Sequence, residues 1–171
     1  MTTRRTVLAA SLAAPALVLA SLRRAEAQAQ VPSIGAIHVD VSRLAAQGWG
    51  SNALAIKIGL EQELTAALGP TLRRGAGPTL NVAVRGVFLN SYAGGGGGGG
   101  HVGSGASQSS DSFDSEATLV GRGNRIIATY PVLTTVPASA AGPWYLPDID
   151  QRRLTGLIQT NAAWIKRYVS G

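Results

Sequence analysis

Along residues 34–169 the apolar side chains recur with a period of two residues in some stretches and of 3.6 residues in others. The order of these stretches is the sequence feature that most restricts the possible folds. At 34–41, Ile37, Val39 and Val41 alternate with small or polar residues, which is typical of a half-buried strand. Helical spacing follows up to residue 68, and the two-residue period returns at 79–92, 112–122 and 125–136. A last stretch, up to residue 169, is again helical. The pattern predicts a strand, a helix, three strands and a helix.

Both predicted helices have one apolar stripe and their own end signals. Ser51 or Asn52 is a candidate N-cap of the first helix, and Gly69-Pro70 is expected to end it. Asp148 or Asp150 is the candidate cap of the second helix. The stripes consist of Ala53, Ile56, Leu60, Leu64 and Ala67, and of Leu154, Leu157, Ile158, Asn161, Ile165, Tyr168 and Val169; Arg152, Arg153, Lys166 and Arg167 are expected mostly off the second stripe.

Glycine and proline positions refine the strands and suggest how they assemble. The apolar parity of 79–92 changes after Gly86, which predicts a bulge there. Residues 121–124 (GRGN) predict a tight hairpin, and Pro131 places the last strand at an edge or a bulge. We expect residues 28–171 to form a single α+β domain, a two-layer β-α-β-β-β-α sandwich whose four-stranded mixed sheet is covered on one face by two helices.

Residues 1–27 have the features of a bacterial export signal. Arg4 and Arg5 precede an apolar run at 6–20, which is too short to span a bilayer comfortably, and small-x-small sites predict cleavage after Ala27 or Ala29. The TRRTVL pattern fits the twin-arginine route, and an ordinary secretory signal is the alternative. Either route predicts a periplasmic or secreted protein, and no later stretch is a transmembrane candidate.

Charge and cysteine content exclude several classes of protein. Four arginines and one glutamate of the predicted signal account for half of the +6 net charge. The remaining basic residues occur in scattered pairs without interleaved aromatics, so we expect no nucleic-acid binding. The chain has no cysteine, which excludes a disulfide framework and an acylated N-terminal cysteine.

The Gly/Ser-rich stretch at 93–111 contains seven consecutive glycines and is interpreted as a flexible loop between two antiparallel strands. Residues 98–103 match GxGxxG by letters, but no helical period follows to place a phosphate at a helix N-terminus. No serine there lies in a GxSxG elbow, and a floppy segment cannot hold His101 as a base. We therefore expect no cofactor.

No other residues predict a catalytic or metal centre. His38 is expected opposite the apolar side of its strand. His101, Asp111, Asp114 and Glu116 could be gathered as metal ligands, since Asp114 and Glu116 share a strand face, but a solvated acidic face is the simpler interpretation. We assign no catalytic residue, metal ligand or cofactor, and we favour a non-enzymatic role.

Aromatic residues in predicted loops are the candidate partner contacts, namely Trp49, Trp144 and Tyr145. With edge strands that could pair with another chain, they favour a domain that binds an envelope protein. One alternative is a metal-dependent or hydrolytic enzyme exported by the twin-arginine route, using His38, Asp40 or the Asp114/Glu116 pair. Another is a small-molecule or lipid binder using the apolar space between sheet and helices. The oligomeric state is not predicted.

Two resemblances agree with an envelope protein. The segments ATYP (128–131) and WYLPDID (144–150), in an Ala/Gly/Arg-rich chain, resemble uncharacterised exported proteins of alphaproteobacteria. The order of elements over 33–169, with its long hairpin loop, is similar to small Gram-negative envelope proteins, the lipopolysaccharide-assembly lipoprotein and the auxiliary lipoproteins of lipid-transport ABC systems. This second resemblance implies an envelope partner, although those proteins carry an acylated cysteine that this chain lacks.

Overall fold

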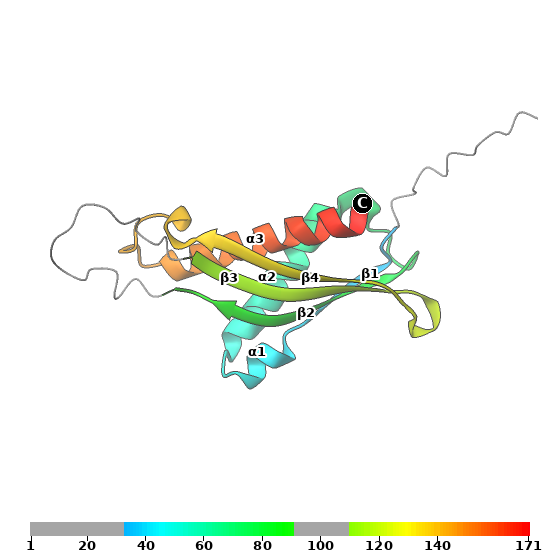
Figure 1. Cartoon of the computed structure of the whole chain (residues 1–171), viewed down its shortest axis with the longest axis horizontal. Coiled ribbons are helices and arrows are strands. Elements are labelled where there is room, and N and C mark those ends of the chain that lie inside the picture. Colours follow the sequence, from blue (N-terminus) through cyan, green and yellow to red (C-terminus); the bar gives the residue numbers. More distant parts are fainter. Residues whose placement is uncertain (1–32, 91–109) are drawn as a thin grey trace, which may run out of the picture.

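The computed structural model describes residues 33–90 and 110–171 and has the predicted α+β architecture (Figure 1). The strands are β1 (Ala36–Asp40), β2 (Thr79–Phe88), β3 (Ser110–Val120) and β4 (Ile126–Pro137), and the α-helices are α1 (Ser42–Ala46), α2 (Ser51–Leu68) and α3 (Ile149–Ser170). Three short 3₁₀ turns, η1 (Gly69–Thr71), η2 (Arg122–Asn124) and η3 (Ala138–Ala141), complete the described part. The predicted signal, with Arg4 and Arg5, and the predicted loop up to residue 109 lie outside it.

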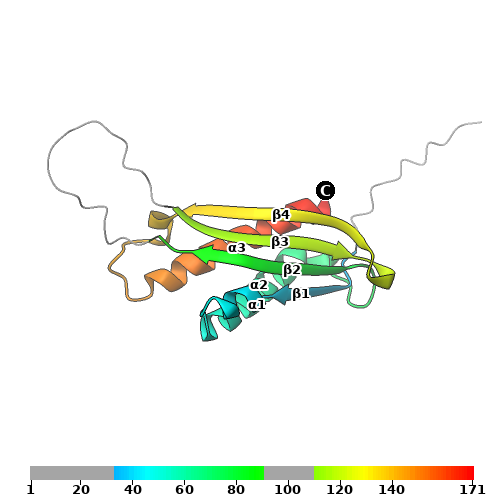
Figure 2. The same ribbon diagram turned by 60° about the horizontal axis from the view of Figure 1, so that its bottom comes forward.

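The strands form one mixed sheet in the order β1-β2-β3-β4. β1 pairs with β2 in parallel, so α2 lies on the crossover between them, and β2, β3 and β4 form the predicted antiparallel meander. The short helix α1 was not predicted. Figure 2 shows α2 and α3 on the same side of the sheet, so no helix of the described residues covers the other face, which is called the open face below.

The core lies between the sheet and the helices. α2 packs against β1 and α3, and α3 packs against β3 and β4. Every second residue of β3, and of β2 as far as Val84, points into this layer, as the sequence pattern predicts. Its most completely buried members include Leu80, Val82, Phe113 and Ala117 from the sheet, and Ile56, Leu60, Leu64, Leu157 and Ile165 from the helices.

The strand signals in the sequence are confirmed, with shifted ends. The pairing of β2 with β3 jumps between Val84 and Gly86, which is the predicted bulge. Asn124 and Gly123 have positive φ values of 59° and 67° in the β3–β4 turn, and Pro131 lies in the edge strand β4. β3 begins at Ser110, so residues 110 and 111 belong to the sheet and not to the predicted loop at 93–111.

The helix ends agree with the predicted ones only in part. The N-cap of α2 is Gly50, which precedes both predicted caps, and no side chain caps that helix. Asp148 is the N-cap of α3, but its carboxylate accepts a hydrogen bond from Nε of Arg152 (2.8 Å) and none from the helix backbone. Gly69 ends α2 with a φ of 41°, as predicted. Within the described ranges, no helix is long and apolar enough to cross a membrane.

Candidate functional site at one end of the sheet

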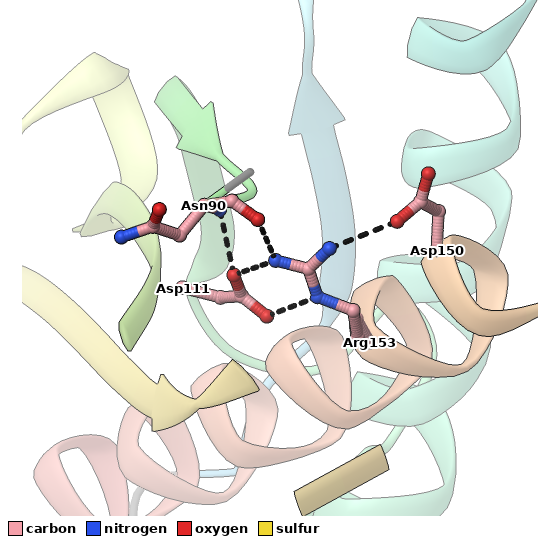
Figure 3. A network of polar contacts seen from close by, with 4 residues as sticks. All are labelled: Asn90, Asp111, Asp150 and Arg153. Atoms are coloured by element: carbon pink, nitrogen blue, oxygen red, sulfur yellow. Dashed lines mark hydrogen bonds and ion pairs between the residues drawn. The ribbon is translucent and has the colours of Figure 1, made fainter. Parts of the chain in front are cut away.

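A buried arginine joins the helix layer to the sheet at the end where β2 finishes and β3 begins (Figure 3). Arg153, in the first turns of α3, is only 5% exposed. Its Nε donates to Oδ2 of Asp111 at 2.7 Å, and its Nη2 donates to Oδ1 of the same carboxylate, which is also buried. The prediction that Arg153 lies mostly off the buried stripe was wrong, because this bidentate ion pair allows the charge to be buried.

The same guanidinium holds two further groups. Nη2 donates to the backbone oxygen of Asn90 at 2.6 Å, and Nη1 donates to Oδ1 of Asp150 at 2.9 Å. The backbone N–H of Asn90 in turn donates to Oδ1 of Asp111 at 2.8 Å. The hydrogen bond to Asp111 holds the pKa of Arg153 above its ordinary value, against the opposing effect of burial. The end of β2, the start of β3 and the start of α3 are thus fixed to one another.

A second buried polar contact fixes α3 further along the sheet. Asn161 accepts a hydrogen bond from Ser115 Oγ at 3.0 Å and donates one from Nδ2 to Thr134 Oγ1 at 3.0 Å. Eight helical residues from Arg153 to Asn161 span about 12 Å. Four strand residues from Asp111 to Ser115 span about 13 Å. Because the two spacings agree, both contacts form only in one register of α3 on β3.

The loop that leads into α3 presents two exposed aromatic rings. Trp144 is 67% exposed and Tyr145 is 70% exposed, and their rings meet edge to face with centroids 6.0 Å apart and planes at 79°. Prolines at 143 and 147 flank the segment. Two backbone hydrogen bonds order it, from Leu146 N–H to the oxygen of Pro143 and from Ile149 N–H to the oxygen of Leu146, both at 3.2 Å. The loop therefore presents the rings on a constrained backbone.

The third predicted partner contact, Trp49, lies elsewhere. It precedes α2 and is partly buried against the core, far along the chain from the aromatic loop. The rings of Trp144 and Tyr145 contact each other, whereas Trp49 packs against the core and, within the described residues, makes no ring contact with either. Whether any of the three contacts a partner stays a prediction.

A surface groove of about 290 Å³ adjoins the Arg153 network. It runs between the start of α3 and the end of β4 with η3. Gly156 lines it, and a Cβ atom added there would meet nothing within 4 Å. The other lining residues are Asp111, Val136, Pro137, Ala140, Ala141, Gln151, Arg152, Arg153, Thr155 and Gln159.

The residues considered for metal binding or catalysis do not converge. Asp111 faces the helices and is bound by Arg153, whereas Asp114 and Glu116 alternate onto the open face of β3, where Glu116 pairs with Arg85. His38 is exposed on the edge strand β1, and His101 lies outside the described residues. Within residues 33–90 and 110–171, no group of three or more His, Cys, Asp or Glu side chains could hold a metal ion.

Asp40 has a local structural role. Its Oδ1 accepts the backbone N–H of Ser42 at 2.8 Å, at the start of α1. This hydrogen bond is the main cause that holds the pKa of Asp40 below its ordinary value. Asp40 is exposed and stabilises the turn from β1 into α1.

The sequence contained a signal for the Arg153 network. Arg153 lies four residues before Leu157, and Asp111 has the same parity as Phe113, so both occupy buried positions of regular patterns. Arg153 was nevertheless predicted to lie off the buried stripe, because its charge was given more weight than its place in the helical pattern. No protein-family model and no curated protein matches the chain, so what the protein does must be inferred from its sequence and geometry.

Proposed function

We propose that the protein is an exported, non-enzymatic domain of the bacterial envelope that binds another protein through Trp144 and Tyr145. The observation that carries the proposal is the pair of adjacent rings, each at least two-thirds exposed, in one ordered loop. Tryptophan and tyrosine are enriched among the residues that dominate binding energy in protein interfaces. The proposed location, periplasmic or secreted, is supported by the signal features of residues 1–27.

The surroundings of the two rings favour binding at low entropic cost. Immobilising a free side chain on association costs about 0.5–1.5 kcal/mol. The edge-to-face contact and the flanking prolines restrict the rings before any partner arrives. The loop continues directly into α3, whose start is fixed to both β2 and β3 through Arg153. The rings are thus mounted on a rigid part of the fold.

The test is site-specific photo-crosslinking in intact cells, with the crosslinking amino acid at Tyr145. We expect one discrete adduct, and we expect affinity capture from envelope extract to recover the same protein in stoichiometric amount. Trp144→Ala should abolish that capture. Trp164→Ala is the matched control, because Trp164 is also exposed but lies near the other end of α3. No adduct from position 145, or equal capture by both variants, would contradict the proposed function.

The groove beside Arg153 favours a second candidate function, the binding of a small ligand. Its volume of about 290 Å³ is close to the lower end of the range for ligand pockets. It lies on the surface and not in the predicted apolar space between sheet and helices. Native mass spectrometry of protein purified from the envelope should then show a bound molecule, and Gly156→Leu, which fills the groove, should remove it. A ligand-free spectrum for the unaltered protein would exclude this candidate.

A further inference from the structure

Helix α2 carries apolar side chains on a second face, away from the core. Its buried stripe is complete without Leu54 and Ile58, which remain 57% and 46% exposed. They lie four residues apart, so they form one ridge along the helix surface. The sequence predicted a single apolar stripe for this helix. An exposed apolar ridge on a helix that already fills its share of the core indicates a contact with something else.

A groove runs beside this ridge, between α2 and α3, with a volume of about 430 Å³. Gly59, Leu154 and Ile158 form its apolar floor, and a Cβ atom on Gly59 would lie 3.4 Å from Cδ1 of Ile158. Ala55, Ile58, Gln62, Glu63, Gln151 and Thr155 complete its lining. Near Glu63 the two helices are joined, because Gln159 Nε2 donates to Glu63 Oε1 at 3.3 Å.

We propose that this ridge and groove form the interface of a homodimer, in which the ridge of each copy lies in the groove of the other. In a two-fold interface the same patch meets itself, so a patch must carry both a projection and its complement. Leu54 and Ile58 supply the projection, and the apolar floor beside them supplies the complement. Ridges fitted into grooves are the general mode of helix packing.

The size of the helix layer fits a weak but specific dimer. α2 has 18 residues and α3 has 22, so the helices are about 27 and 33 Å long. Each helix is about 10 Å wide, so the outer face of the pair is about 20 Å across and covers about 600 Å². Two copies would bury about 1,200 Å², at the lower limit for stable interfaces. We expect dissociation in roughly the micromolar range.

The charges of α2 agree with an antiparallel contact. Lys57 is in the N-terminal half of the helix, and the acidic Glu61 and Glu63 are in the C-terminal half. A two-fold axis across α2 sets the N-terminal half of one copy against the C-terminal half of the other, so opposite charges meet. Within one copy Lys57 and Glu61 lie 3.9 Å apart and are about one-third exposed, so both can take part in contacts between copies.

Sedimentation equilibrium of the purified chain over a range of about 1–200 µM tests the dimer, that range being set by the expected affinity. We expect a monomer–dimer equilibrium that Ile58→Glu weakens by at least about 30-fold. Leu133→Glu is the matched control, because Leu133 is an apolar residue of the open sheet face and is 67% exposed. Its dissociation constant should be unchanged. A monomer at all concentrations, or a dimer that Leu133→Glu weakens as much as Ile58→Glu does, would overturn the proposal.

Cysteine crosslinking provides a second test, which does not depend on a destabilising charge. The chain has no cysteine, so Ile58→Cys and Leu133→Cys each create a single thiol. A short bismaleimide should crosslink Ile58→Cys into dimers and leave Leu133→Cys monomeric. Efficient crosslinking of Leu133→Cys alone would overturn the proposal, as would capture of a different protein by Ile58→Cys in cells while the chain itself is monomeric. Trp144→Ala should not alter dimerisation, so failure here and failure of the proposed function are distinguishable.

Discussion

Replacing Asp111 by asparagine tests whether the buried ion pair holds α3 on the sheet. The two side chains are almost completely buried, with 3% of Arg153 and 2% of Asp111 exposed. The side-chain amide introduced by Asp111→Asn keeps one oxygen, which can still accept from the backbone of Asn90. Its NH₂ group, however, would face a guanidinium N–H and cannot accept from it. One charge-assisted hydrogen bond is lost, and the charge of Arg153 loses its buried partner.

The size of the expected loss of stability follows from the burial of the ion pair. Breaking a buried ion pair by removing one partner costs about 3–5 kcal/mol. Asp150 still contacts Arg153 at 2.9 Å, but its side chain is 73% exposed and so compensates only in part. We expect Asp111→Asn to lower the free energy of unfolding by about 3 kcal/mol. For a chain of this size, that corresponds to about 10 °C in the melting temperature.

Urea unfolding followed by circular dichroism measures this loss, and Glu116→Gln is the control. Glu116 pairs with Arg85, but these side chains are 33% and 38% exposed, so the control should cost no more than about 1 kcal/mol. Arg153→Met completes a double-mutant cycle. We expect the loss of stability in the double variant to be smaller than the sum of the two single losses by about 2 kcal/mol, since each single change already removes the contact between Arg153 and Asp111. Equal losses for Asp111→Asn and Glu116→Gln, or a coupling energy near zero, would refute the reasoning.

Four further substitutions probe other parts of the structure. Gly77→Ala should lower the free energy of unfolding in urea by at least about 2 kcal/mol, because φ is 109° and a Cβ would lie 1.9 Å from the oxygen of Ser33. Gly75→Ala is the milder comparison, because the space around Gly75 is open, and it should lower the same free energy by about 1 kcal/mol. Gly156→Ala should raise stability by about 1 kcal/mol, because nothing lies within 4 Å of the added carbon; a loss would contradict an open groove. The pKa of Asp40 is lowered in the folded state, so Asp40 contributes to folding stability above its unfolded pKa of about 4. That contribution is lost as pH falls through the folded pKa. Asp40→Asn should therefore remove this part of the pH dependence of the free energy of unfolding.

The sequence was a reliable guide where a residue's environment follows from its near neighbours. The bulge at Gly86, the turn at 121–124 and the end of α2 at Gly69 were all predicted from local signals. Gly69 and Gly123 have positive φ values, which glycine adopts readily, and the change of apolar parity after Gly86 marked the bulge. The order of strands and helices was predicted for a similar reason. Periods of two and 3.6 residues reflect which side of a local element faces the core.

Only part of the candidate site could be predicted from such local signals. Trp144 and Tyr145 were selected because they lie in a loop between two predicted elements. The Arg153 network was missed, since Arg153 and Asp111 are 42 residues apart and neither reveals its partner. An arginine in the middle of a buried stripe is unfavourable by itself, and only a carboxylate brought to it by folding makes the position tolerable.

The amino-acid sequence by itself thus determined the succession of elements, the places where they turn, and the two-layer class, because these depend on periodicity and on the conformational preferences of single residues. The tertiary structure alone decided that Asp111 neutralises Arg153, that Asn161 bridges Ser115 and Thr134, and that α2 keeps Leu54 and Ile58 outside the core. Those outcomes depend on which distant side chains become neighbours, and burial of charge or exposure of an apolar group is favourable or costly only in relation to such neighbours.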